Sequence, residues 1–322
     1  MAEISIIVPC FNNEKYIKRC LDSLVNQTLK DIDIIVVDDG STDRSAEIVK
    51  NIDDNRIRLF TKKNEGIASA RNFGLSKVES EYFGFLDSDD YCEPETFEIL
   101  INEIKKNNSD LVVCNFLWEF EGAPNKNYMQ IEGPYKPGKE MMTKLFATLW
   151  NKIYKTSFVK ELGYKFIDGY RYEDASFLYK MCSYVNSISF VDKPFFHYTQ
   201  RKGSITRTYN EKVKDMVFIF NDLYDYYEKH NLLDNYKDEL EYIFIRFFLG
   251  NSFLRAAKIQ DDNDKKNTLD MSWNILNSKF PNWRKNIYIE QKGSIKNIYY
   301  RVIKKNNYKL IANLYSFFNK QW

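Results

Sequence analysis

The stretch ISIIVPCFNNEKYIKRCLDSLV, residues 4–25, decides the fold because it changes from one periodicity to another. Its first five residues form a short, β-branched run that is typical of a buried strand. After the polar loop PCFNNE, apolar residues recur at the i, i+4, i+7 and i+8 spacing of one helix face: Ile17, Leu21, Leu24 and Val25. The stretch predicts a strand, a loop and a helix in direct succession.

The same succession recurs through the first 118 residues. Four further short apolar runs follow: residues 33–37 (DIIVV), 57–60 (IRLF), 82–86 (YFGFL) and 111–116 (LVVCNF). A second helical face lies between the last two runs: Phe97, Leu100, Ile101 and Ile104. This alternation predicts an α/β fold with a mainly parallel, twisted sheet and helices on both faces. Ligands of such sheets bind at the carboxyl ends of the strands.

The second half of the chain has a different organisation. Residues 121–138 are rich in Gly, Pro and Asn, which predicts a loop or an internal boundary. Residues 172–185 (YEDASFLYKMCSYV) predict an amphipathic helix, and residues 187–200 (SISFVDKPFFHYTQ) predict a strand and turn. From about residue 210 the pattern is helical and aromatic, so we expect a C-terminal helical extension.

Composition and charge narrow the class of protein. The 322 residues are 44% hydrophobic and 29% charged, as in globular proteins. The net charge is +2, but residues 291–322 hold seven basic residues and no acid, which leaves −5 on the preceding part. The basic tail predicts either a pair of helices packed on the rest of the protein with a solvated basic side, or peripheral binding to an anionic membrane. Nucleic acid is the less favoured partner because the body is acidic.

Cysteine usage and the N-terminus indicate a cytoplasmic protein, at most bound to the inner face of the membrane. Five widely spaced cysteines without a C-x-x-C pair predict reduced thiols, and not a disulfide or zinc framework: Cys10, Cys20, Cys92, Cys114 and Cys182. The first residues, MAEISIIVP, do not resemble a signal peptide, and no window approaches 18 apolar residues.

Residues 85–94, FLDSDDYCEP, place three carboxylates directly after the fourth apolar run. Side chains at i and i+2 of an extended chain point the same way, so Asp87 and Asp89 can face one ligand. A hard divalent cation, Mg²⁺ or Mn²⁺, would relieve their repulsion. An acidic turn is the alternative interpretation. A calcium EF-hand is excluded, because Cys92 replaces the required glycine and Pro94 interrupts the loop.

The other strand-end loops offer groups for a nucleotide. Phe11 could stack on a base, and Asn12 could hydrogen-bond. In residues 38–43 (DDGSTD), Asp39 precedes a glycine, which by itself is also common turn chemistry. Arg71 follows the third run, where a solvated charge is the alternative. The G-x-G-x-x-G and G-x-x-x-x-G-K-S/T motifs are absent, so dinucleotide and P-loop sites are not expected.

Six segments together resemble the family 2 glycosyltransferases of the GT-A fold. In the family's order, and covering roughly residues 4–205, they are SIIVPCFNNEKYIKRCLDSLVNQT, IIVVDDGSTDRS, NEGIASARNFGL, YFGFLDSDDYCEP, WNKIYK and YEDASFLYK. The resemblance implies a nucleotide-binding set: Pro9, Phe11, Asn12, Glu14, Asp39, Arg71, Asp87, Ser88, Arg201 and Ser204. Within it, Asp39 would read the base imide.

The resemblance also implies the reactive groups. Asp89, with Asp87, would bind a divalent metal that bridges the diphosphate, and Asp174, beside Glu173, would be the general base. The segment RKGSIT, residues 201–206, is similar to the region that covers the diphosphate. His197 would be either a further metal ligand or a packed structural histidine.

The resulting expectation is an inverting glycosyltransferase. It would move a hexose or N-acetylhexosamine from a UDP-sugar to a glycan or lipid-linked acceptor in bacterial surface polysaccharide synthesis. Residues 1–210 would form the GT-A domain, with a nucleotide-binding half (1–118) and an acceptor and base half (119–210), and residues 211–322 the helical region. Two alternatives stay open: a catalytically silent sugar-nucleotide-binding scaffold, and a nucleotidyltransferase, although PCFNNE lacks the latter's glycine-rich basic loop.

Overall fold

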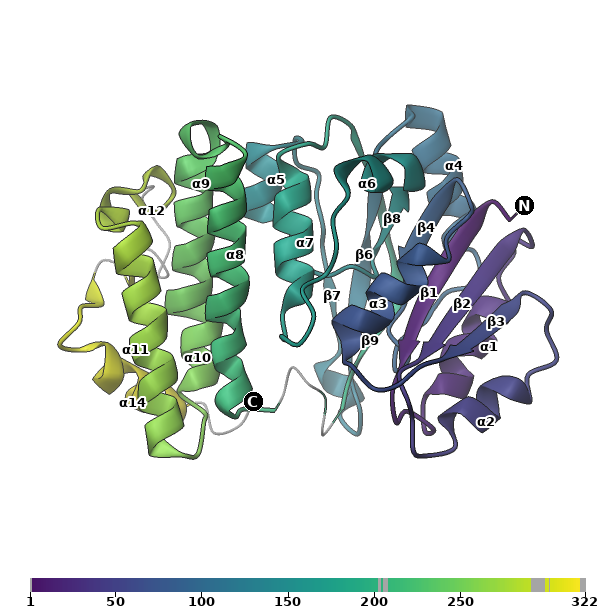
Figure 1. Cartoon of the computed structure of the whole chain (residues 1–322), viewed down its shortest axis with the longest axis horizontal. Coiled ribbons are helices and arrows are strands. Elements are labelled where there is room, and N and C mark those ends of the chain that lie inside the picture. The colour runs from purple at the N-terminus through teal and green to yellow at the C-terminus, as the bar shows by residue number, and fades with distance from the viewer. Residues whose placement is uncertain (1, 202–203, 205–207, 291–298, 301, 319–322) are drawn as a thin grey trace. The chain divides into compact units, whose positions relative to one another are not determined.

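A computed structural model describes the chain except for residues 1, 202–203, 205–207, 291–298, 301 and 319–322 (Figure 1). The chain forms two compact units. The first comprises residues 1–169 and 173–202, and the second comprises residues 170–172 and 203–322. The functional division at residue 210 stays a prediction.

The first unit is built on a nine-stranded sheet with the order β3-β2-β1-β4-β8-β6-β9-β5, and β7 pairs with β6. The strands are β1 Ile4–Cys10, β2 Ile32–Asp38, β3 Ile57–Thr61, β4 Tyr82–Phe85, β5 Tyr91–Cys92, β6 Leu111–Phe120, β7 Tyr128–Gln130, β8 Lys152–Lys155 and β9 Ile188–Gln200. The first four in spatial order are parallel, and β8 runs antiparallel to both β4 and β6. The predicted α/β class is confirmed.

Helices cover both faces of this sheet (Figure 1). They are α1 Ile17–Val25, α2 Ser45–Lys50, α3 Ile67–Ser76, α4 Thr96–Asn107, α5 Lys139–Lys144, α6 Thr156–Leu162 and α7 Glu173–Cys182. The apolar faces of α1 and α4 share a buried cluster with Ile4, Ile6 and Val8 of β1. The α3 helix packs on the opposite face, so closely that a Cβ at Gly74 would lie 2.4 Å from Cγ2 of Ile7.

The sheet register brings the predicted loops to one edge. In β1 and β2, Cys10 pairs with Asp38, and in β1 and β4, Ile7 pairs with Phe85. The loops that follow these three parallel strands therefore leave the sheet at the same edge. The sequence did not reveal β5, β7 or β8. The first two have only two and three residues, and β8 (KIYK) lacks the continuous apolar run that marks the equally short β4 (YFGF).

The second unit is helical, which confirms the predicted extension. Its described α- and π-helical elements are α8 Asp215–Lys229, α9 Leu233–Arg246, a π-helical turn Phe247–Asn251, α10 Ser252–Ala256, α11 Asp262–Lys279, α12 Ile287–Glu290 and α14 Tyr308–Phe318. Its core is aromatic: the rings of Phe220 and Phe244 lie 5.1 Å apart in an edge-to-face arrangement. In the described part of the chain, no helix has the length and apolarity needed to cross a membrane.

The cysteine prediction is confirmed by the structure. All five cysteines are unpaired and buried. Burial raises the pKa of each thiol, as for Cys10 and Cys92, whose pKa values rise to about 12. Such thiols stay protonated and behave as small apolar side chains.

Candidate active site

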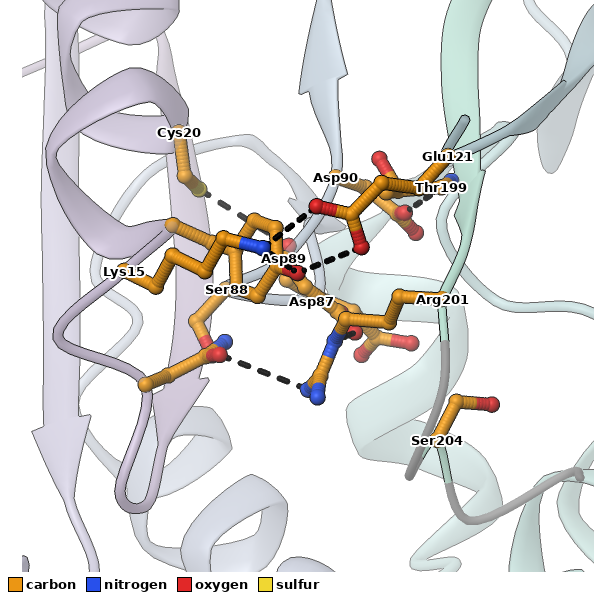
Figure 2. Close-up of polar contacts among 12 residues, drawn as sticks. Lys15, Cys20, Asp87, Ser88, Asp89, Asp90, Glu121, Thr199, Arg201 and Ser204 are labelled. Atoms are coloured by element: carbon orange, nitrogen blue, oxygen red, sulfur yellow. Dashed lines mark hydrogen bonds and ion pairs between the residues drawn. The ribbon is translucent and has the colours of Figure 1, made fainter. Parts of the chain in front are cut away.

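The three aspartates that follow β4 have three different partners, and Figure 2 shows those of Asp89 and Asp90. Oδ1 of Asp87 accepts a hydrogen bond from the Arg71 guanidinium at 2.8 Å, and Oδ2 of Asp89 accepts one from Nε of Arg201 at 2.8 Å. Their side chains are 25% and 21% exposed. Asp90 is buried, and its Oδ1 accepts the backbone N–H of Thr199 at 2.7 Å. Asp87 and Asp89 can therefore meet a ligand, whereas Asp90 fastens the loop to β9.

Burial and the neighbouring acids of this loop raise the pKa values of Asp89 and Asp90. Burial raises the pKa of Asp89, the neighbouring charge of Asp87 raises it further, and the Arg201 guanidinium opposes both. Burial likewise raises the pKa of Asp90 well above its ordinary value. A second cation, Arg19, donates to the backbone carbonyl of Asp89 at 2.9 Å. The repulsion between the acids is thus reduced by arginines that are distant in sequence.

Arg71 of α3 joins the aspartate loop to the start of α7. Its buried guanidinium forms ion pairs with Asp87 and with Glu173, which is also buried. Burial alone would lower the pKa of Arg71, but the surrounding carboxylates outweigh it and raise the pKa. Burial raises the pKa of Glu173 to about 7, against the opposing effect of Arg71. The solvated-charge interpretation of Arg71 is wrong, because the side chain is enclosed by carboxylates.

Asp174, the predicted base, follows Glu173 in the first turn of α7. The side chain is half-buried, and its Oδ1 accepts the N–H of Ala175 at 2.8 Å. The amino end of a helix stabilises an ionised carboxylate. The nearby Arg71 adds a positive charge within electrostatic reach of Asp174. Asp174 thus lies beside a helix amino end and a cation, and its general-base role stays a prediction.

The WNKIYK segment contributes a second cation near α7. Lys152 of β8 is buried, and its ammonium group donates to the Thr148 carbonyl at 2.7 Å and to Oδ1 of Asn151 at 2.6 Å. Burial lowers the pKa of Lys152 to about 8, while several acids, among them Asp174, oppose the shift. The sequence indicated this segment only through family resemblance, because no local pattern announces a buried lysine.

Asn12 and Glu14 connect two of the strand-end loops. Asn12 has a left-handed backbone with φ of 48°, and its N–H donates to Oγ of Ser41 at 2.9 Å. Its Oδ1 accepts the N–H of Thr42 at 2.8 Å. Oε2 of Glu14 accepts the N–H of Arg44 at 3.1 Å. Asn12 and Glu14, both predicted to bind the nucleotide, thus fix the loop after β1 against the loop after β2.

Phe11, Pro9 and Asp39 occupy three different environments. Phe11 is 48% exposed, so its ring is available for stacking on a base, whereas Pro9 lies within β1. Asp39 is buried, and its carboxylate accepts the N–H of Gly66 at 2.7 Å and the ammonium of Lys62 at 2.8 Å. Asp39 therefore holds the loop before α3, and the base-reading role stays a prediction.

Asn13, Ser88 and Tyr16 complete the surroundings of Arg201. The buried Asn13 donates from Nδ2 to Oγ of Ser88 at 2.7 Å and accepts from Arg201 through Oδ1 at 3.3 Å. The Arg201 guanidinium also lies 4.8 Å from the ring centroid of Tyr16. Sequence reasoning missed Asn13 and Tyr16. Their polar and aromatic character within PCFNNEKY was the only available signal.

The structure supports the packed-histidine interpretation of His197. Its Nδ1 lies 2.7 Å from Oε1 of Glu119, and its Nε2 lies 2.9 Å from Oε1 of Glu93. The imidazole also stacks on Tyr91, with ring centroids 4.2 Å apart. Both ring nitrogens are therefore engaged away from Asp87 and Asp89.

Ser204 belongs to the second unit, where its carbonyl oxygen accepts from Oγ1 of Thr208 at 3.0 Å. Residues 202–203 and 205–206 of the segment RKGSIT lie outside the described residues. The predicted diphosphate role of Ser204 stays a prediction.

The oxygen donors of Asp87 and Asp89 fit a hard divalent cation. Among the described residues, no group of three or more His, Cys, Asp or Glu side chains gathers as a complete metal shell. Mg²⁺ and similar ions are commonly held by one or two carboxylates, with water and substrate phosphates completing the shell. The partly exposed aspartates therefore fit a metal that is shared with a diphosphate.

Comparison with known proteins identifies relatives of this chain. Residues 5–166 match the family model described as Glycosyl transferase family 2. The chain is 31% identical to glycosyltransferase EpsH of Bacillus subtilis over 251 residues, which cover 74% of this chain and 73% of EpsH.

Solved structures show the same fold. S. aureus TarS 1–349 in complex with UDP-GlcNAc gives a TM-score of 0.73 at 23% identity, covering 100% of this chain and 93% of TarS 1–349. The mannosyltransferase PcManGT from Pyrobaculum calidifontis, in complex with GDP-Man and Mn²⁺, gives 0.53 at 14% identity, covering 99% and 88%. At these identities the likeness concerns the fold alone.

We predict that Arg71→Met destabilises the protein by about 3–5 kcal/mol, because it leaves the buried Glu173 and the partly exposed Asp87 without their counterion. Adding Glu173→Gln should restore part of this loss, with a coupling of about 0.5–3 kcal/mol in a double-mutant cycle. Urea unfolding measures both values. Arg58→Met, which breaks a more exposed pair with Asp33, is the matched control and should cost less. If the effects of the two substitutions on the free energy of unfolding were strictly additive, an energetic contribution from the Arg71–Glu173 ion pair would be contradicted.

Proposed function

This chain belongs to glycosyl transferase family 2 and is a glycosyltransferase, and on that premise we propose a specific reaction for it. It transfers a hexose or N-acetylhexosamine from a UDP-sugar to a glycan or lipid-linked acceptor, with inversion and with help from a divalent metal. The acceptor is a bacterial surface polysaccharide or its precursor. Membership of this family argues against the nucleotidyltransferase, and UDP release in the presence of donor and acceptor would exclude the silent scaffold.

One observation carries the proposal. Arg71 pairs with Asp87 on one side and with Glu173 on the other, and Asp174 follows Glu173 directly. One carboxylate suited to a metal, Asp87, and the carboxylate suited to a base are therefore held near a single guanidinium, while Asp89 is held by Arg201. The complexes of TarS with UDP-GlcNAc and of PcManGT with GDP-Man and Mn²⁺ support a nucleotide-sugar donor and a divalent metal.

Departure of the nucleoside diphosphate requires neutralisation of its growing negative charge. Asp87 and Asp89 would hold a divalent ion, which when bound supplies Lewis-acid stabilisation of the diphosphate. Arg201, beside Asp89, adds a cation to the same region. The exposed ring of Phe11 offers a stacking surface for uracil.

Attack requires an acceptor hydroxyl that loses its proton in the transition state. Asp174, at the amino end of α7, would receive that proton from an acceptor hydroxyl within hydrogen-bond distance. A single displacement from the face opposite the leaving diphosphate inverts the anomeric carbon. An α-linked donor would then give a β-linked product.

We predict that Asp89→Asn and EDTA each remove most activity, because both take away the link between protein and diphosphate-bound cation. The measurement is UDP release from a panel of UDP-sugars with Mn²⁺ or Mg²⁺, with and without acceptor saccharides. Activity lost to EDTA should return on adding metal. Asp53→Asn, an exposed aspartate on another loop, is the control. Full activity in EDTA would exclude metal dependence.

We predict that Asp174→Asn lowers turnover by roughly 10²–10⁴-fold, the usual contribution of a general base, and leaves UDP affinity unchanged. Steady-state kinetics gives turnover, and isothermal titration calorimetry with UDP gives affinity. A comparable loss of UDP binding would instead assign Asp174 to donor binding. A variant that retains half its turnover would remove it from the mechanism altogether.

The C-terminal helix supports a membrane-facing acceptor. In α14, Leu310 and Leu314 are exposed one turn apart, whereas Tyr308 and Ala312 are buried. The exposed Lys304 and Lys305 precede this helix. Residues 295, 298 and 301, which belong to the same predicted amphipathic tail, lie outside the described residues. We propose that this surface binds the anionic inner face of the cell membrane.

We predict that Lys304→Glu/Lys305→Glu weakens co-sedimentation with anionic liposomes, because each basic residue contributes about 1 kcal/mol near such a surface. Binding should also decline as salt rises. Lys229→Glu/Lys237→Glu makes the same charge change on α8 and α9 and is the control. Equal pelleting of both variants would leave the tail as a packing element only.

A further inference from the structure

Arg201 is held by contacts that all lead to the aspartate loop and its neighbours (Figure 2). Its Nε donates to Oδ2 of Asp89 at 2.8 Å, and a terminal nitrogen donates to Oδ1 of Asn13 at 3.3 Å. The ring of Tyr16 lies beneath the guanidinium. The side chain is 22% exposed, so it is partly withdrawn from water but open to a ligand.

The ion pair uses the carboxylate that the proposed function assigns to the metal. Two cations compete for the Asp89 carboxylate: the Arg201 guanidinium and an incoming divalent ion. Nε of Arg201 occupies one acceptor site of Oδ2, and a second positive charge on the same carboxylate would be repelled by the guanidinium. Asp89 can accept a metal through its other oxygen, but the charge repulsion weakens that binding until Arg201 moves to another anion.

A nucleoside diphosphate supplies such an anion. Guanidinium groups bind phosphate oxygens through two parallel N–H donors, a geometry that matches phosphate as well as carboxylate. Arg201 can therefore exchange Asp89 for a phosphate oxygen without losing a charged partner. The exchange leaves Asp89 to the metal, which the same diphosphate completes with its own oxygens.

We propose that Arg201 is the resident counterion of Asp89 and makes divalent metal and nucleotide bind cooperatively. In the free protein it holds the carboxylate and keeps metal affinity low. When UDP or a UDP-sugar binds, Arg201 transfers to the diphosphate, and the metal takes its place on Asp89. By reciprocity, the factor by which UDP strengthens metal binding equals the factor by which metal strengthens UDP binding. This inference rests on the proposed metal site.

A plain diphosphate-binding role for Arg201 makes a different prediction. If Arg201 only contacted phosphate, its removal would weaken UDP binding and leave the affinity for metal alone unchanged. Under the exchange that we propose, removal strengthens the binding of metal alone. The sign of the effect on metal affinity in the absence of nucleotide therefore separates the two roles.

The test is Mn²⁺ binding to the full-length protein, measured by electron paramagnetic resonance and calorimetry with and without UDP. UDP is a product, so no turnover interferes. We expect Arg201→Gln to bind Mn²⁺ alone at least about fivefold more tightly than the native protein, the lower end of ordinary coupling factors. The strengthening of Mn²⁺ binding by UDP should decrease by a similar factor. Arg201→Lys keeps the charge and should stay nearer the native values.

Two further variants isolate the Asp89 pair. Lys15→Gln removes a positive charge that is paired with Glu121 and not with Asp89, so it should change Mn²⁺ affinity less than about twofold if the effect is specific to the pair. Asp89→Asn in the Arg201→Gln background should abolish the gain in affinity. Thermal unfolding and UDP binding verify that each variant is folded.

The outcomes separate the inference from the proposed function. If UDP promotes Mn²⁺ binding but Arg201→Gln binds Mn²⁺ alone no more tightly, the counterion role is overturned and the metal site stands. If Lys15→Gln produces the same gain, the effect is general electrostatics and the role is also overturned. If Mn²⁺ binds no variant even with UDP, the metal site and the inference fail together.

Discussion

The buried guanidinium of Arg71 is the interaction on which the site depends. It lies between Asp87, which follows β4, and Glu173, which begins α7, and both ion pairs are largely removed from water. A charge in such a place is costly unless its partners surround it. The protein meets this condition by bringing three distant segments together. The same three segments carry the proposed metal-binding and base carboxylates, so the stability of the fold and the geometry of the site have a common origin.

The rest of the architecture serves to bring these segments to one edge. Parallel pairing of β1 with β2 and β4 places the loops that follow them side by side. The close approach of Gly74 to Ile7 seats α3 on the sheet, and this fixes the backbone from which Arg71 extends. Side-chain oxygens of Asn12 and Glu14 accept hydrogen bonds from the backbone after β2 and hold neighbouring connections in place. The exposed parts of the site are thus supported by a rigid, buried scaffold.

The three aspartates in FLDSDDYCEP show how one short acidic run can serve several purposes. Asp87 pairs with Arg71, Asp89 with Arg201, and Asp90 with the backbone of Thr199. Arg71 lies in α3, whereas Thr199 lies in β9 and Arg201 directly follows that strand, so the three acids have separate partners although they are close in sequence. Only the first two remain open to a ligand, which agrees with a cation site made of two carboxylates and completed by a substrate.

The sequence by itself determined the strand and helix succession, the loops at the carboxyl edge and the acid pairs at residues 87–89 and 173–174, because these depend on short-range periodicity and spacing. The tertiary structure alone decided which charges meet. Arg71 and Glu173 are 102 residues apart, and Arg201 and Asp89 are 112 apart. Such pairings follow from the order of the strands in the sheet. The sequence did not reveal that order, because β5 has only two residues and β8 (KIYK) lacks a continuous apolar run. A side chain's partner across that distance is set by the packing of the sheet, which no local pattern encodes.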